Sequence, residues 1–174
     1  MKLRYAFLLV TCLLALAPVS SWAGQSAKEA KAQIEKVGAK EALHMWWSTQ
    51  AWQDVYDGIA SGKNEWLQVA ELLRPASDAG ASEDLSDAIS DALPKNPVGV
   101  LRFVKDSKDF REFTVEGACF ASPRSETRSG ALRFIKASER AVKKIQAADL
   151  KEAKARCLKS LNESRQEVLS WPAP

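Results

Sequence analysis

His44 is the only histidine of the chain, and this limits the chemistry that its residues can perform. A multi-histidine metal site is excluded, and a Ser-His-Asp mechanism would have to use His44 as its base. This residue lies in the apolar segment 42–46, where packing is commoner than catalysis. We find no Gly-x-Ser-x-Gly turn, no phosphate-binding glycine loop and no His-Glu-x-x-His zinc motif. The sequence therefore indicates no metal, no cofactor and no catalytic residue, and it favours a non-enzymatic role while leaving an enzyme open.

Four of the six tryptophans lie close together in the sequence, between positions 46 and 66. Such a cluster could stack on a sugar ring or an apolar ligand, or it could supply large core residues to short helices. Trp52 and Trp66 fall on apolar helix stripes, which assigns them to the core. Trp46 and Trp47 are adjacent and cannot point the same way on a helix. We therefore expect one of these two to be exposed as a binding residue.

Two ridges of like charge are the other candidate binding features. Glu83, Asp87 and Asp91 recur every four residues and form what we call the acidic ridge. Arg133, Lys136, Arg140 and Lys144 form the basic ridge. Like charges one turn apart repel by roughly 0.2–0.5 kcal/mol per pair. The two ridges could face each other, could each bind a partner, or could simply be solvated.

Cys119 and Cys157 are predicted to form a disulfide. A third cysteine, Cys12, lies in an N-terminal segment that we expect to be removed. Two cysteines in an exported protein pair readily, because the compartment is oxidising. They lack the Cys-x-x-Cys spacing of a redox centre, so the bridge is expected to be structural. Two buried free thiols are the alternative.

The first 23 residues read as a signal peptide. Lys2 and Arg4 precede a short apolar run, and the segment closes with Ser21-Trp22-Ala23, which predicts cleavage after Ala23. The alternative is a lipoprotein signal with Cys12 as the modified residue. Neither this run nor any later one is long enough to span a bilayer comfortably. We therefore expect a periplasmic or secreted protein, residues 24–174, with no integral membrane segment after cleavage.

Charge is unevenly distributed along the predicted mature chain. The whole-chain net charge of +3 falls to about +1 when Lys2 and Arg4 leave, so the basic pI is not evidence of nucleic-acid binding. Residues 24–123 are net acidic and residues 124–174 are net basic. The mature protein is thus an electrostatic dipole along its sequence.

Helical periodicity dominates the elements that must position these residues. Ser26 to Glu29 form a capping box, and Gly38 can end the first helix. A short apolar segment follows near residues 42–47. One helix is expected to carry the apolar stripe 52–59, and a second to begin at Asn64 and stop before Pro75. A third is expected to begin at Ser82 and stop at Pro94, and a fourth to run from Asn96-Pro97 to Val104.

The C-terminal part is expected to differ from these short helices. Residues 106–122 should contain one helical turn near Phe110 and then extended chain holding Cys119, before two longer helices over about 125–146 and 150–169. Helices of about ten residues are not stable alone and must pack on neighbours. We therefore expect one all-α domain, either an irregular helical bundle or a short α-solenoid-like array of helix pairs, ending in a longer helical hairpin.

Several short segments resemble a pattern in uncharacterised small exported helical proteins of proteobacteria. They are 58–62 (Gly-Ile-Ala-Ser-Gly), 66–70 (Trp-Leu-Gln-Val-Ala), 78–82 (Asp-Ala-Gly-Ala-Ser) and Asn96-Pro97, within about residues 45–120. This resemblance implies an exported helical protein and carries no activity.

The preferred hypothesis is therefore an exported, non-catalytic protein that binds a protein partner. It could act as an immunity-type or inhibitor-type protein on an envelope or secreted protein. The alternative is a small envelope enzyme or glycan-binding domain that uses Trp46, Trp47 and His44 with Asp54 and Asp57. Binding of the basic C-terminal helix to a membrane surface is weaker, because acidic residues interrupt its positive face.

Overall fold

The computed structural model describes residues 25–107, 113–120 and 127–171, and all regular structure within these ranges is helical. The predicted signal peptide and the predicted turn near Phe110 lie outside the described residues. The α-helices are α1 (Ala27–Val37), α2 (Ala39–Trp46), α3 (Gln50–Ala60), α4 (Asn64–Leu73), α5 (Ala79–Ala92), α6 (Pro97–Val104), α7 (Val115–Ala118), α8 (Arg128–Lys143) and α9 (Lys151–Ser170). Short 3-10 helices, η1 (Arg74–Ala76) and η3 (Ala148–Leu150), follow α4 and precede α9. The all-α prediction is confirmed.

Side-chain caps fix where most of these helices begin. The predicted capping box is present, because Ser26 and Glu29 bond reciprocally at the start of α1. Asn96 caps α6 through the N–H of Gly99, with Pro97 at the first helical position. At the other end of α1, Gly38 has φ +88°, a conformation that favours glycine and separates α1 from α2.

Two expected helix starts were wrong. Asp78, not Ser82, caps α5 by accepting a hydrogen bond from the N–H of Ala81, so α5 begins one turn earlier and buries Ser82. Lys63, not Asn64, is the cap position of α4. Asn64 lies inside the helix, where its side chain accepts a hydrogen bond from Asn96. No side chain caps α4, because the Asn64 amide is bonded to Asn96, a partner distant in the sequence that local patterns do not reveal.

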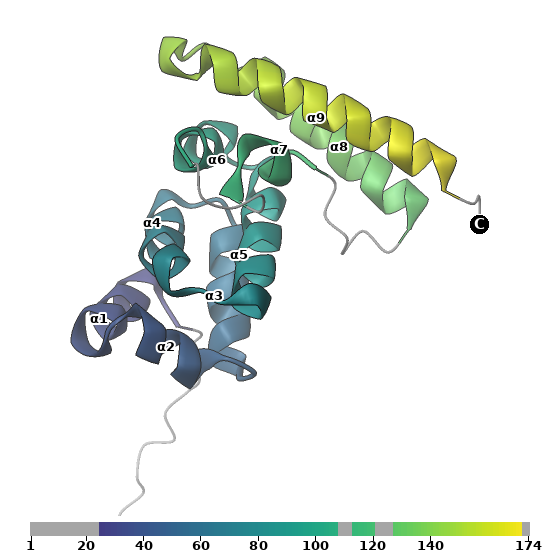
Figure 1. Ribbon diagram of the computed structural model, residues 1–174. Helices are drawn as coiled ribbons and strands as arrows, with labels where there is room; N and C mark the ends of the chain where they lie inside the picture. Colours follow the sequence, from purple (N-terminus) through teal and green to yellow (C-terminus); the bar gives the residue numbers. More distant parts are fainter. Residues whose placement is uncertain (1–24, 108–112, 121–126, 172–174) are drawn as a thin grey trace, which may run out of the picture.

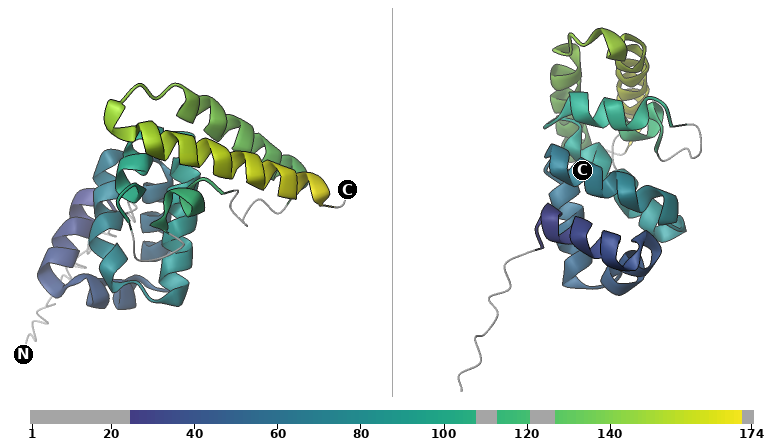
Figure 2. Two further views of the ribbon diagram at one scale, coloured as in Figure 1. Left: turned by 45° about the horizontal axis from the view of Figure 1, so that its top comes forward. Right: turned by 90° about the vertical axis from the view of Figure 1, so that its left-hand side faces the viewer.

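The helices pack as an irregular bundle followed by a hairpin (Figure 1). Helices α1 and α2 lie at one end, α3 and α5 run side by side through the centre, and α4 packs on α1, α3 and α6. These contacts cross between helix pairs, so the array is not a solenoid in which each pair contacts only its neighbours. Helices α8 and α9 form the expected long hairpin, which lies across the opposite end next to α6 and α7 (Figure 2).

Buried apolar residues form one cluster that runs from Ala27 in α1 to Val168 in α9. The predicted core tryptophans Trp52 and Trp66 belong to it, and so does Trp46. Two buried serines, Ser138 and Ser160, lie on the facing helices of the hairpin. Ser160 is bonded to α7, because its hydroxyl donates a hydrogen bond to the backbone oxygen of Glu116.

Candidate binding surfaces

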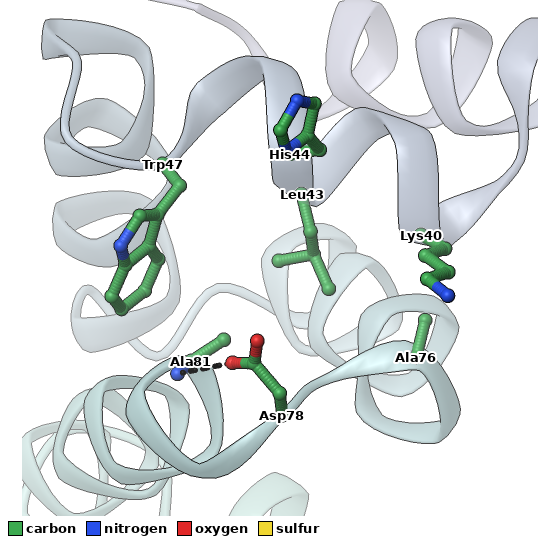
Figure 3. Close-up of a pocket in the computed structure, with 7 residues that line it drawn as sticks. All are labelled: Lys40, Leu43, His44, Trp47, Ala76, Asp78 and Ala81. Carbon is green, nitrogen blue, oxygen red and sulfur yellow. Dashed lines mark hydrogen bonds between the residues drawn. The ribbon is translucent and has the colours of Figure 1, made fainter.

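A cavity of about 380 Å³ lies between α2 and the start of α5 (Figure 3). Helix α2 supplies one wall, and η1 with the first turn of α5 supplies the other. The residues that line it are Lys40, Leu43, His44, Trp47, Ala76, Asp78 and Ala81. We call this cavity the Trp47 pocket.

Trp47 is the exposed member of the tryptophan pair. Helix α2 ends at Trp46, and the extended backbone of Trp47 (φ −51°, ψ 133°) turns the two indoles apart. Trp46 is 3% exposed in the core, whereas Trp47 is 40% exposed at the pocket. Its ring lies against Trp52, with the centroids 5.3 Å apart, and its edge lies over Gly80 of α5. The exposed indole is therefore held in place from two sides.

Asp78 and His44 lie on opposite walls of the pocket (Figure 3). One oxygen of the Asp78 carboxylate accepts a hydrogen bond from the N–H of Ala81 at 3.3 Å. No hydrogen bond joins His44 to a carboxylate within the described ranges. Such a bond would have favoured an enzyme with His44 as a base.

The carboxylates expected to serve His44 are occupied elsewhere. Asp54 accepts hydrogen bonds from the backbone of Gln25 and the side chain of Gln50. Asp57 accepts one from Gln53. Neither lines the Trp47 pocket. Within residues 25–107, 113–120 and 127–171, no group of three His, Cys, Asp or Glu side chains could hold a metal ion.

The acidic ridge takes part in packing α3 against α5. Asp91 accepts a hydrogen bond from the hydroxyl of Tyr56 at 2.9 Å. Beside the ridge, Asp84 accepts one from the indole N–H of Trp52 at 2.8 Å. Both donors belong to nearly buried aromatic residues of α3, which need a hydrogen-bond partner. These carboxylates therefore satisfy buried groups of the same chain, a role that the sequence did not reveal.

The basic ridge faces solvent along α8. Arg133, Lys136, Arg140 and Lys144 are all exposed. The acidic residue of α8, Glu139, lies on another side of the helix, where it pairs with Arg165 of α9 and with Lys143. Among described residues, no ion pair neutralises the ridge. Cations near the last turn of a helix favour its dipole, but Arg133 and Lys136 lie too far from that turn to be explained by it.

Cys119 and Cys157 form the predicted disulfide, with Cα atoms 5.2 Å apart. Cys119 follows the short helix α7, so the extended chain expected before it was wrong. The bridge fits an oxidising compartment.

Further contacts fasten α7 to α9 beside the disulfide. The guanidinium of Arg156 donates two hydrogen bonds to Glu116, at 2.8 and 2.7 Å, and Ser160 donates one to the backbone oxygen of Glu116. The Arg156 bonds hold the pKa of Glu116 below its ordinary value and raise the pKa of Arg156.

Most residues that line the Trp47 pocket could not be recognised as binding residues from the sequence. Leu43, Ala76 and Ala81 carry no chemical signal, and Lys40 is one of many lysines. Asp78 could have been predicted as the N-cap of α5. Aspartate is a favoured N-cap residue, and its side chain can accept a hydrogen bond from the backbone N–H three residues later. A helix predicted to begin directly after Asp78 would have placed this carboxylate at an exposed helix N-terminus.

Comparison with known proteins found no matching family model, curated protein or solved structure. None of the helices in the described part of the chain is long and apolar enough to cross a membrane.

Proposed function

We propose that this chain is an exported, non-catalytic protein-binding domain whose basic ridge on α8 recognises an acidic surface of an envelope or secreted protein. The observation that carries this proposal is the exposure of the whole ridge, which forms no ion pair with any acidic residue in the described part of the chain. Complementary charge speeds association and orients partners. An immunity-type or inhibitor-type role is one form that such binding would take.

Export is supported by the signal-like segment 1–23 and by the disulfide, which fits an oxidising compartment. Mass spectrometry of the protein recovered from the producing cell should find Gly24 at the N-terminus and no acyl chain. A diacylated Cys12 at the N-terminus would instead place the protein on a membrane.

The binding proposal is tested by capturing partners from periplasmic extract with three forms of the protein. One form is unchanged, and the ridge variant carries Arg133→Glu, Arg140→Glu and Lys144→Glu. The control variant carries Lys28→Glu, Lys36→Glu and Lys63→Glu, which change the net charge equally at exposed lysines outside the ridge.

We expect the unchanged and control proteins to capture the same acidic protein, and the ridge variant to lose it. Salt should release that protein, because exposed charges are screened. Circular dichroism should show that all three forms are folded. Equal capture by the ridge variant would refute the proposal.

The relationship to uncharacterised exported helical proteins, suggested by the short segments within residues 45–120, also remains a proposal. The segments that carry it have packing roles here: Gly58 lies against Trp66, and Gly62 adopts φ +75° at the turn after α3. They support a shared fold and not a shared activity.

A further inference from the structure

We infer that the Trp47 pocket binds a neutral sugar ring, at a site separate from the basic ridge. Helix α2, which supplies one wall of the pocket, lies at one end of the molecule. Helix α8 lies at the opposite end (Figure 1). No residue is common to the two. The inference therefore goes beyond the proposed protein binding and does not depend on it.

The first argument is the rigid, exposed indole. Trp47 offers an aromatic surface at a pocket wall, while Trp52 and Gly80 restrict its movement. A group already held in its binding orientation loses little entropy when a ligand arrives. The π-face of an indole is electronegative, so it attracts the polarised C–H bonds on the face of a pyranose.

The second argument is the polar rim. Asp78 uses one carboxylate oxygen on the N–H of Ala81, which leaves the other as an acceptor. Lys40 brings an ammonium donor, and His44 brings an imidazole that can donate or accept. The pocket therefore offers both donors and acceptors, as the hydroxyl groups of a sugar require.

The third argument is the balance of charge. A cationic ligand on Trp47 would gain from the indole and Asp78 but would be repelled by Lys40. An anionic ligand would gain from Lys40 but would be repelled by the Asp78 carboxylate and by the electronegative face of the indole. A purely apolar ligand would pack on Leu43, Ala76 and Ala81 but would leave the polar rim without partners. A neutral ring with apolar faces and a polar edge matches all the walls.

The size of the pocket agrees with a small ligand. Small-molecule sites usually measure about 300–1,000 Å³. The Trp47 pocket, at about 380 Å³, lies near the lower end of that range. It suits one or two sugar units at the end of a glycan rather than a long chain laid in a groove.

Three probes with the same ring and different charge test the inference. They are N-acetylglucosamine, which is neutral, glucosamine, which is cationic, and glucuronate, which is anionic. Binding is followed by NMR through the indole N–H signal of Trp47, assigned by its loss in Trp47→Phe. Benzyl alcohol serves as an apolar probe without a sugar ring.

We expect N-acetylglucosamine to shift the Trp47 signal with an affinity at least about tenfold higher than that of either charged ring. Trp47→Ala should abolish binding, measured by saturation transfer to the sugar's own NMR signals because this variant lacks the indole signal. Asp78→Asn should weaken binding while preserving the cap of α5, since asparagine caps helices well. Leu169→Ala, which truncates an exposed apolar side chain on α9, is the matched control and should bind normally.

A second variant keeps the test valid if Trp47→Ala unfolds. A Cβ at Gly80 would lie 3.2 Å from the Trp47 ring, so Gly80→Ala should push the indole aside by a few tenths of an ångström while every lining side chain remains. We expect it to weaken sugar binding. Equal binding of the charged rings, binding of benzyl alcohol alone, or no shift with any sugar would overturn the inference. The ridge variant described above should bind the sugar normally, which separates this result from the fate of the proposed function.

Discussion

The packing of α3 against α4 requires a glycine at position 58. The indole of Trp66 on α4 lies directly over the Gly58 Cα, and an added Cβ would overlap that ring. Elsewhere in a helix, replacing glycine with alanine is favourable by up to about 1 kcal/mol. Here the overlap has to be relieved by moving α4 or the ring. Gly58 is therefore the point that sets how closely α3 and α4 approach.

We predict that Gly58→Ala lowers the free energy of unfolding by about 1–3 kcal/mol, the usual cost of overpacking. Urea denaturation followed by circular dichroism measures it. The same change in a Trp66→Leu background should cost much less, because residues in contact are non-additive. If the two substitutions lower the free energy of unfolding additively, the Trp66 ring is not what excludes a side chain at position 58.

Helix ends could be predicted from the sequence where only residues close together in the chain determine them. The Ser26 capping box and the turn at Gly38 depend only on neighbouring atoms, and both were predicted. The roles of Asp84 and Asp91 were missed, since their donors on α3 are more than thirty residues away in the sequence. None of the three interpretations considered for the acidic ridge included the hydrogen bond that Asp91 accepts from the nearly buried Tyr56.

Among the elements, α7 is the one most dependent on its tethers. It has four residues, too few to be stable alone, and it is held to α9 by the disulfide and by the Glu116–Arg156 pair. Periodicity could not reveal so short a helix. The disulfide itself could be predicted, because only two cysteines follow the expected signal peptide and the expected compartment is oxidising.

We predict that Cys157→Ser lowers the free energy of unfolding by about 2–5 kcal/mol, the usual loss on removing a native bridge. The bridged residues are 38 apart, for which chain entropy alone gives about 4 kcal/mol. Denaturation should be compared with the unchanged protein under non-reducing conditions. Unchanged stability in the variant, or free alkylatable thiols in the native protein, would contradict the prediction.

The Glu116–Arg156 pair predicts a pH dependence of stability. Because the folded-state pKa of Glu116 is lowered, its contribution is complete above the ordinary glutamate pKa of about 4.3 and is lost as pH falls through the lowered value. Both side chains are partly exposed, so the effect should stay below about 1 kcal/mol.

Glu116→Gln should reduce stability near neutral pH and leave it nearly unchanged in strong acid. Denaturation midpoints at several pH values measure this. Glu167→Gln, on an exposed position of α9, is the control and should follow the unchanged protein. The same pH profile in the Glu116 and Glu167 variants would show that the pair with Arg156 has no part in it.

At the scale of the whole molecule, the charge dipole of the sequence becomes a separation in space. The basic hairpin lies across one end of the bundle, and the more acidic helices form the rest (Figure 1). This arrangement follows from the order of the chain, since the two long helices pack mainly on each other. The Trp47 pocket could not be foreseen at this scale, because it needs α2, η1 and α5 brought together from over forty residues of sequence.

The two proposed sites should therefore act independently. Two sites are coupled only when binding at one changes the free energy of binding at the other. The pocket and the ridge share no residue. Helix α2, which lines the pocket, and helix α8, which carries the ridge, lie at opposite ends of the molecule (Figure 1). Saturating N-acetylglucosamine should consequently leave the partner captured through the ridge in place, whereas about 0.5 M salt should release it, since that salt shortens the screening distance to a few ångströms. Release of the partner by N-acetylglucosamine, with none by the same concentration of benzyl alcohol, would mean that the pocket and the partner surface form one interface.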